Sequence, residues 1–254
     1  NVYALGEFIS EATNATTYGG GTVEVCVASP TNIATGGIGG ATYGDYTCDG
    51  PATTASANGQ AKREIFGGAG IKYKIKANPD EQLNYYFHGW TETNSLTGNL
   101  FATEASPAEV ATDYPSWGSD KTYNFYAIFF KWRWGYGFPC TVHAIGGGTV
   151  SMDGDISSSK TTLTPTGKTN KKKDTEIVTT YYAHETASVE FVGWYNNEAG
   201  TGDPLGTNLE LEVRYVPTSI DENNPSAKTD ITYYAIFRPK LMGYTQPCEI
   251  KISG

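Results

Sequence analysis

The chain has 254 residues, enough for one large domain or two ordinary ones, and each half could bury its own core. Thirty Gly and eighteen Tyr, with only two Met, favour strands and turns over helices, so the expected fold class is mainly β. A formal net charge of −9 argues against a nucleic-acid or anionic-membrane partner, because either would need a basic face.

Targeting and membrane signals are weak in this sequence. The longest apolar run, at 125–130, is strand-sized and far from the roughly 18 residues that cross a bilayer as a helix. The first residues have neither the basic start nor the apolar core of a signal peptide. We therefore expect no membrane span, and either a cytosolic chain or a mature fragment that has lost its targeting segment. We also expect a monomer.

Residues 1–18 are interpreted as a lead-in strand. The stretch at 2–5, Val-Tyr-Ala-Leu, is similar to Phe-Tyr-Ala-Ile at 125–128 and to Tyr-Tyr-Ala-Ile at 233–236. These two later stretches each end a longer pattern. The first segment is therefore predicted to be the closing strand of a preceding module, or a substitute for such a strand.

Two stretches repeat one pattern around a Gly-Trp pair. Residues 85–91 read Tyr-Tyr-Phe-His-Gly-Trp-Thr, and residues 189–195 read Val-Glu-Phe-Val-Gly-Trp-Tyr. Both are preceded by Gly-Gly-Gly-Thr-Val, at 19–23 and 146–150, and both are followed by Tyr-Ala-Ile-Phe, at 126–129 and 234–237. The spacing predicts two tandem homologous β-rich modules, at 19–131 and 140–254. The end of the chain is either the last strand of the second module or the start of a third.

The first module is longer between its Gly turn and its Trp. This distance is 69 residues (90 − 21) against 46 (194 − 148), which leaves 23 extra residues within an inserted loop at 28–62. Its Gly, Ala, Thr and Ser bury little, so we expect a surface loop and a candidate binding region containing Tyr43 and Tyr46. A disulfide between Cys26 and Cys48 would pin this loop, and two free thiols are the alternative.

Within the modules, residues 71–76 alternate strictly and are predicted to form a hairpin with 85–90. Residues 175–180 align with 71–76 without a gap, and the stretch 100–114 is matched with 209–217. An aromatic connector at 132–139 is expected to pack between the modules, with Trp132 and Trp134 in the junction. Cys140 and Cys248 occupy equivalent positions after it, too far apart in such an arrangement to form a disulfide.

The Gly-Gly-Thr-Val opening, the aromatic-x-Gly-Trp-Tyr centre and the Thr-Tyr-Tyr-Ala-Ile-Phe close resemble the internalin-type B-repeats, or Listeria-Bacteroides repeats, particularly their divergent versions in gut bacterial surface proteins. The best matches are residues 191–195 and 232–237. The resemblance covers nearly the whole chain twice, but both modules exceed the usual length and Thr91 replaces the Tyr after Trp. It implies secreted or cell-surface β-grasp-like modules with an adhesive or spacer role and no enzymatic activity. The family has no shared ligand-binding residues to carry over.

No catalytic constellation is recognisable in the sequence. The three His are scattered, and neither His-Glu at 184–185 nor Gly-Lys-Thr at 167–169 completes a zinc or phosphate-loop motif. Acidic turns at 153–155 and 221–224 could offer oxygens to Ca²⁺, but neither follows a calcium-hand loop. We therefore expect no cofactor and no catalysis.

The aromatic residues divide into expected core and expected surface. Trp90 and Trp194 occupy equivalent strand positions, which favours a core role over a sugar platform. The repeat core is expected to contain four residues: Trp90, Trp194, Tyr126 and Tyr234. The candidate binding residues are Trp117, Tyr43, Tyr46, Trp132 and Trp134. The predicted function is a bacterial surface protein that binds a host protein or glycan, or acts as a spacer; the alternative is a carbohydrate-binding module that uses these aromatics and the 28–62 loop.

Overall fold

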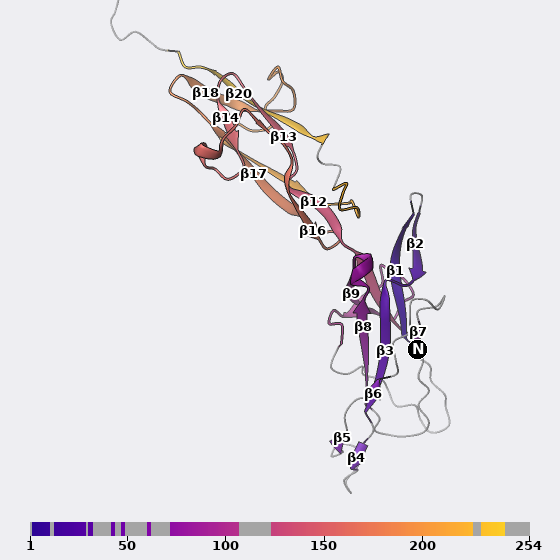
Figure 1. The fold of residues 1–254 in the computed structure, drawn as a ribbon. Coiled ribbons are helices and arrows are strands. Elements are labelled where there is room, and N and C mark those ends of the chain that lie inside the picture. The colour runs from indigo at the N-terminus through magenta and orange to yellow at the C-terminus, as the bar shows by residue number, and fades with distance from the viewer. Residues whose placement is uncertain are drawn as a thin grey trace, which may run out of the picture. The chain divides into compact units, whose positions relative to one another are not determined.

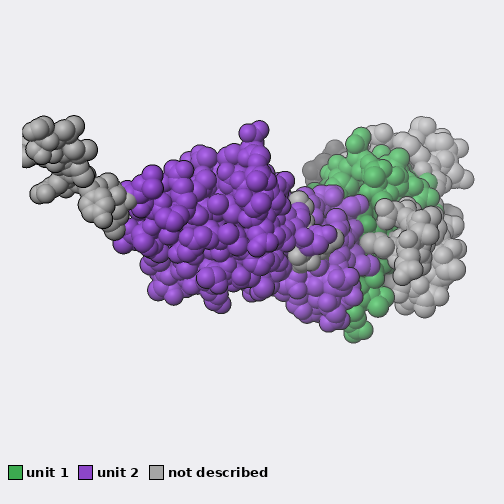
Figure 2. Space-filling model, turned by 90° about the horizontal axis from the view of Figure 1, so that it is seen from above, with its two compact units in different colours: residues 1–132 green, residues 133–254 purple. Residues whose placement is uncertain are grey.

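The computed structural model describes residues 2–10, 13–28, 30–32, 42–43, 47–48, 60–61, 72–106, 123–225 and 230–241. The chain divides into two compact units, residues 1–132 and 133–254, which Figures 1 and 2 distinguish. Strands dominate both units, so the expected mainly β class is confirmed. The described helical turns η2 (Glu81–Leu83) and η3 (Ile156–Ser158) are short 3-10 segments. Within the described ranges, no helix is long and apolar enough to cross a membrane.

The larger sheet of unit 1 is built around its first and last strands. Its strands are β10 (Leu100–Ala102), β9 (Tyr85–Thr91), β11 (Phe125–Lys131), β1 (Val2–Ser10) and β2 (Thr13–Tyr18), in that order, with β7 (Gln60–Ala61) also on β1. The pairing of β1 with β11 is parallel, and the others are antiparallel. Figure 1 shows β1 and β2 as a long hairpin. The segment expected to be a lead-in is therefore the inner strand of this sheet and its neighbour.

A second sheet covers one face of the first and encloses the core of unit 1. It contains β6 (Thr47–Cys48), β3 (Gly21–Ala28) and β8 (Lys72–Pro79). Val23 and Ile75 from this sheet pack in one cluster with Trp90 and Phe129 from the larger sheet. Each apolar side chain of this size contributes about 1.5–3 kcal/mol when it leaves water, so this cluster is the main source of stability in unit 1.

The hairpin expected between 71–76 and 85–90 is not formed. β8 pairs with β3, and β9 pairs with β10 and β11, so the two segments lie in different sheets. The chain crosses between the sheets through η2, where the Asp80 carboxylate accepts a hydrogen bond from the Leu83 backbone N–H. Asn84 ends this turn in the left-handed region, with φ 61°. A turn of this shape redirects the chain instead of folding it back on itself.

Unit 2 contains a larger sheet of the same kind. Its order is β15 (Thr162–Leu163), β13 (Thr141–Ile145), β20 (Thr232–Pro239) and β18 (Val189–Tyr195). A second sheet contains β14 (Thr149–Ser151), β17 (Ile177–His184) and β19 (Glu210–Tyr215). β13 and β20 are parallel, and Val150, Tyr181, Trp194 and Phe237 meet in the core.

The expected aromatic connector is largely a strand of unit 2. β12 (Arg133–Phe138) pairs antiparallel with β16 (Thr166–Lys171), and the boundary between the compact units falls after Trp132. The β12 strand is held further by Tyr215, whose hydroxyl donates to the Tyr136 carbonyl. Burial raises the pKa of Tyr215 to about 12, so this hydroxyl keeps its proton at neutral pH.

The two Gly-Trp strands have matching environments. Trp90 lies opposite Ala127 and Trp194 lies opposite Ala235, and each strand pair has a bulge just before the Trp. In both units the last Gly of the Gly turn packs against a Phe ring. A Cβ on Gly21 would lie 2.7 Å from Phe129, and one on Gly148 would lie 2.3 Å from Phe237. These contacts leave no room for a side chain, which explains the glycine at both positions.

The strand pairing contradicts two of the alignments expected between the two units. Asn78 and His184 are the equivalent strand ends, because they pair with Thr22 and Thr149, so the offset is 106 and not 104. The crossing turn of unit 1 is two residues longer than that of unit 2. The stretch 100–114 also does not match 209–217. β10 pairs with β9, whereas β19 pairs with β17 in the second sheet.

The cysteines differ in their bonding. Cys26 is disulfide-bonded, and the register of β3 with β6 sets it directly opposite Cys48. Their pairing stays a prediction that this register supports. Cys140 is buried and free, and Cys248 lies outside the described residues. The inserted loop at 28–62 includes β4 (Pro30–Asn32) and β5 (Thr42–Tyr43), which pair with each other.

Candidate functional site

Of the expected binding residues, the structure describes the side chains of Trp132 and Trp134. Tyr43 lies in β5, and Tyr46 and Trp117 lie outside the described residues. Trp132 packs in unit 1 against Tyr86, with ring centroids 4.8 Å apart. Trp134 lies in β12 of unit 2, beneath the Lys168 ammonium at 5.8 Å. Both rings are half-buried, so each is engaged within its own unit.

The expected core residues divide between the two faces of the larger sheets. Trp90 and Trp194 are fully buried, which favours the core interpretation over a ligand platform. Tyr126 and Tyr234 are half-buried and lie outside the main core clusters. They stack on their parallel neighbours Tyr3 and His143, at centroid distances of 4.9 and 5.5 Å. Because side chains alternate along a strand, these tyrosines face away from the core that Ala127 and Ala235 line.

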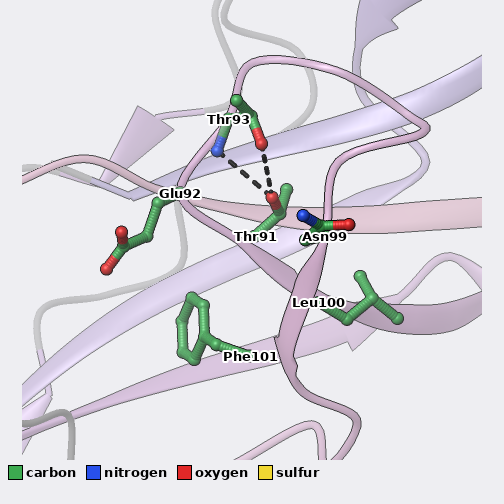
Figure 3. A pocket seen from close by; sticks show the side chains of 6 residues that line it. All are labelled: Thr91, Glu92, Thr93, Asn99, Leu100 and Phe101. Atoms are coloured by element: carbon green, nitrogen blue, oxygen red, sulfur yellow. Dashed lines mark hydrogen bonds between the residues drawn. The ribbon is translucent and has the colours of Figure 1, made fainter.

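An open depression lies at the edge of the larger sheet in unit 1, where β9 ends and β10 begins. Its lining residues are Thr91, Glu92, Thr93, Asn99, Leu100 and Phe101 (Figure 3). They come from the last residue of β9, the turn that follows it, and β10. This region follows directly after the Gly-Trp pair, whose Trp90 is fully buried.

A β-bulge presents Phe101 at this edge. Leu100 pairs with Thr91 and Ala102 pairs with Trp90, so Phe101 is the extra residue between two successive pairs. An extra residue changes the direction of its side chain relative to a regular strand. The Phe101 and Phe125 rings pack edge to face, with centroids 5.7 Å apart, and 45% of Phe101 remains exposed. The ring is therefore both fixed and accessible.

The turn between β9 and β10 is ordered by hydroxyl groups. The Thr91 hydroxyl accepts from the Thr93 backbone N–H at 3.2 Å and bonds the Thr93 hydroxyl at 2.8 Å, as the dashed lines in Figure 3 show. A Cβ on Gly98 would lie 2.5 Å from both of these hydroxyl oxygens. The Gly98 backbone N–H in turn donates to the Ser95 carbonyl. The glycine thus closes the turn tightly over Thr91, which is itself fully buried.

Two polar side chains remain available at the depression. Glu92 and Asn99 are exposed, and neither makes a side-chain hydrogen bond or ion pair within the described part of unit 1. In Figure 3 the Glu92 side chain extends toward the same side as the Phe101 ring. The site therefore combines an accessible aromatic ring with a carboxylate and an amide. Such a set can stack on an apolar ligand face and bond to polar groups at its rim.

The corresponding edge of unit 2 is built differently. In unit 1 Ala102 pairs with Trp90, and in unit 2 Gly206 forms the equivalent bridge to Trp194. Leu205, the residue before Gly206, is therefore the counterpart of Phe101. Tyr195 stands where unit 1 has Thr91, and it is buried, with 7% of its surface exposed. A Cβ on Gly193 would lie 3.0 Å from Pro204. The edge of unit 2 is thus filled by a Tyr and a Pro and has no aromatic ring at the bulge position.

The acidic turn at 153–155 uses its carboxylates to order itself. The Asp153 carboxylate accepts from the Ser158 hydroxyl at 2.6 Å and from the Asp155 backbone N–H at 3.0 Å. The Asp155 carboxylate accepts from the Ser157 backbone N–H at 2.8 Å. These hydrogen bonds favour the charged forms and lower the pKa of both groups. Among the described residues, no group of three or more His, Cys, Asp or Glu is placed to hold a metal.

In comparisons with known proteins, no family model, curated protein or solved structure matches the chain.

Proposed function

We propose that the chain is a non-catalytic bacterial repeat protein, secreted or exposed on the cell surface, that serves in adhesion or as a spacer. In this proposal the two compact units are tandem copies of one β-rich module. The observation that carries it is the repeated pairing scheme: the last described strand of each unit pairs in parallel with an earlier strand, β1 or β13, a Gly-Trp strand lies beside it, and a bulge occurs at the same place.

The strand registers support a residue-by-residue alignment of the two copies. Leu5 pairs with Ile128 and Ile145 pairs with Ile236, so Leu5 is equivalent to Ile145, an offset of 140 (145 − 5). At the Gly turn the offset is 127 (148 − 21), so unit 1 has 13 extra residues there, matching 6–18. These residues contain most of the β1–β2 hairpin. Residues 2–5 therefore match Val-His-Ala-Ile at 142–145, and not the closing strand with which the sequence alone compared them.

The surface location rests on the resemblance to the internalin-type B-repeats, which the tandem arrangement supports. A disulfide at Cys26 is also consistent with an oxidising compartment. The β-grasp-like detail stays a prediction. Adhesion and spacing need rigid modules more than a reacting centre, and each unit encloses its own core.

Surface labelling tests this proposal directly. An antibody raised against the chain should label intact cells of the source bacterium, and brief protease treatment of intact cells should remove the label. If the role is adhesive, beads coated with the purified chain should also adhere to host cells. If the chain is a spacer, the beads should not adhere, and fusing the chain to a surface reporter should make the reporter more accessible. Labelling that requires permeabilised cells, or catalytic turnover of a polysaccharide or peptide substrate, would contradict the proposal.

A further inference from the structure

We propose that the depression lined by Phe101, Glu92 and Asn99 in unit 1 binds a neutral, pyranose-containing glycan. The inference rests on the proposed adhesive function, for which it names the ligand class. It assigns the site to residues other than the Trp and Tyr side chains that the sequence favoured.

The Phe101 ring supplies the apolar contact. Sugar rings carry one face of C–H groups, which pack against the negatively polarised face of an aromatic ring. Phe101 is 45% exposed, and its ring is held by an edge-to-face contact with Phe125 at a centroid distance of 5.7 Å. The ring therefore reaches solvent without having to reorient, which lowers the entropy that binding would cost.

The polar rim supplies the recognition of hydroxyl groups. The Glu92 carboxylate accepts hydrogen bonds, and the Asn99 amide both donates and accepts. Neither side chain has a partner among the described residues of unit 1, so neither must break a protein contact to meet a ligand. Vicinal hydroxyls of a pyranose match this combination of acceptor and amide.

Charge selects against acidic sugars. Glu92 adds a carboxylate to the rim, and the chain carries a formal net charge of −9. A uronate or sialate carboxylate placed beside Glu92 would be repelled, because like charges in contact destabilise a complex. The six lining residues include no Lys, Arg or His that could offset this repulsion. A neutral hexose or pentose is thus the sugar class that fits.

The turn that carries Glu92 and Asn99 is ordered before any ligand arrives. The Thr91 and Thr93 hydroxyls bond each other at 2.8 Å, and Gly98 packs over them. This arrangement fixes both ends of the turn relative to β9 and β10. A fixed site gains affinity because little ordering remains to be done on binding.

Native affinity electrophoresis of the full chain tests the site. The gels contain mixed-linkage β-glucan, xylan or galactomannan as neutral probes, and polygalacturonate as the acidic probe. At least one neutral polysaccharide should retard the chain, and polygalacturonate should not. Phe101→Ala should weaken the retarding interaction by about tenfold or more, as expected for loss of an aromatic anchor. Glu92→Ala should weaken it by about tenfold, because a charge-assisted hydrogen bond is lost.

Leu205→Ala is the matched control, since Leu205 is the equivalent exposed residue of unit 2. It should leave retardation unchanged, and circular dichroism should show that all three variants remain folded. Absence of retardation on every neutral gel, or retardation that survives Phe101→Ala, would overturn the site. Such a failure alongside intact surface labelling would leave the proposed adhesive or spacer function standing. Degradation of the polysaccharide would instead sink the non-catalytic function and not the site.

Discussion

The sheet edges beside the two buried tryptophans share a frame and differ in their surface. At Trp90 the edge ends in a bulge that exposes Phe101 next to a Thr-rich turn. At Trp194 the same edge is closed by Tyr195 and Pro204, and the indole N–H donates to the Asn208 carbonyl at 2.9 Å. Common positions therefore build the core, and the loops that leave them decide what each unit offers to solvent.

This difference indicates where to look for function in a chain whose two units pair their strands in a similar way. Trp90 and Trp194, which coincide in the two units, are fully buried. The open depression falls at positions where the units differ, with Phe101 replaced by Leu205. Binding is thus expected where one copy departs from the other.

Removing either indole should have the largest effect. Trp90→Ala and Trp194→Ala should each lower the free energy of unfolding of their own unit by about 3–5 kcal/mol, because each leaves a large cavity in a closed core. Hydrogen exchange resolved by residue can assign the loss to one unit. A change below about 1 kcal/mol in denaturant titration would show that the indole is not a core group.

Reduction of the disulfide should have the second-largest effect and should change the stability of unit 1 alone. Cys26 in unit 1 is disulfide-bonded, whereas Cys140 in unit 2 is buried and free. A reductant should destabilise unit 1 by roughly 3 kcal/mol, through loss of a loop constraint, and spare unit 2. Cys48→Ser should reproduce the effect if Cys48 is the partner. Thiol titration in denaturant should then find two additional thiols after reduction of the parent chain, and a Cys48→Ser variant as stable as that chain would contradict the pairing.

Replacing each Trp with Phe should show how the loop beside each indole differs between the two units. Trp194→Phe removes the hydrogen bond to Asn208, whereas the Trp90 indole N–H is buried without a partner among the described residues of unit 1. Both exchanges shrink the core similarly. Trp194→Phe should therefore cost about 1 kcal/mol more than Trp90→Phe in denaturant titration. Equal costs would mean that the indole hydrogen bond adds no net stability.

The smallest effect is a pH dependence confined to unit 2. Hydrogen bonds from Ser158 and from the Asp155 backbone hold the pKa of the Asp153 carboxyl below its usual range. A lowered folded-state pKa stabilises the turn above the ordinary pKa of Asp, about 3.9, and this contribution is lost as pH falls through the folded value. Carboxyl chemical shifts followed by NMR should show the lowered pKa. Ser158→Ala should move it upward, and no movement would contradict the assigned cause.

The sequence predicted the buried core positions of the two units better than the strand pairing and the sheet edges. Repetition of the Gly-Trp stretch was enough to single out Trp90 and Trp194, because a large side chain at a repeated strand position has few places to go except inward. The Asn-Pro-Asp turn at 78–80, in contrast, reads the same for a hairpin and for a crossing between sheets. The crossing forms because β8 pairs with β3, which lies some fifty residues earlier in the chain, and not with β9.

The depression could not be predicted for a related reason. Phe101 is the extra residue of a bulge, and a bulge is defined only by the register of two strands. Read alone, Leu-Phe-Ala at 100–102 has no feature that separates an exposed ring from a buried one. A comparison of 100–102 with 204–206 would have exposed the Phe to Leu difference. A gapless extension from the two Trp residues gives that alignment, since 101 − 90 and 205 − 194 are both 11, but matching 100–114 with 209–217 concealed it.

The parallel pairing of first and last strands has a mechanical consequence. In unit 1 the first strand, β1, lies beside β11, the last described strand, whereas in unit 2 β12 precedes the parallel pair of β13 and β20. Tension applied through the ends of such a pair pulls the strands along each other. Their hydrogen bonds are then loaded together in shear, instead of being opened one after another from an end. Unit 1 is thus closed at the point where a stretched chain would pull on it.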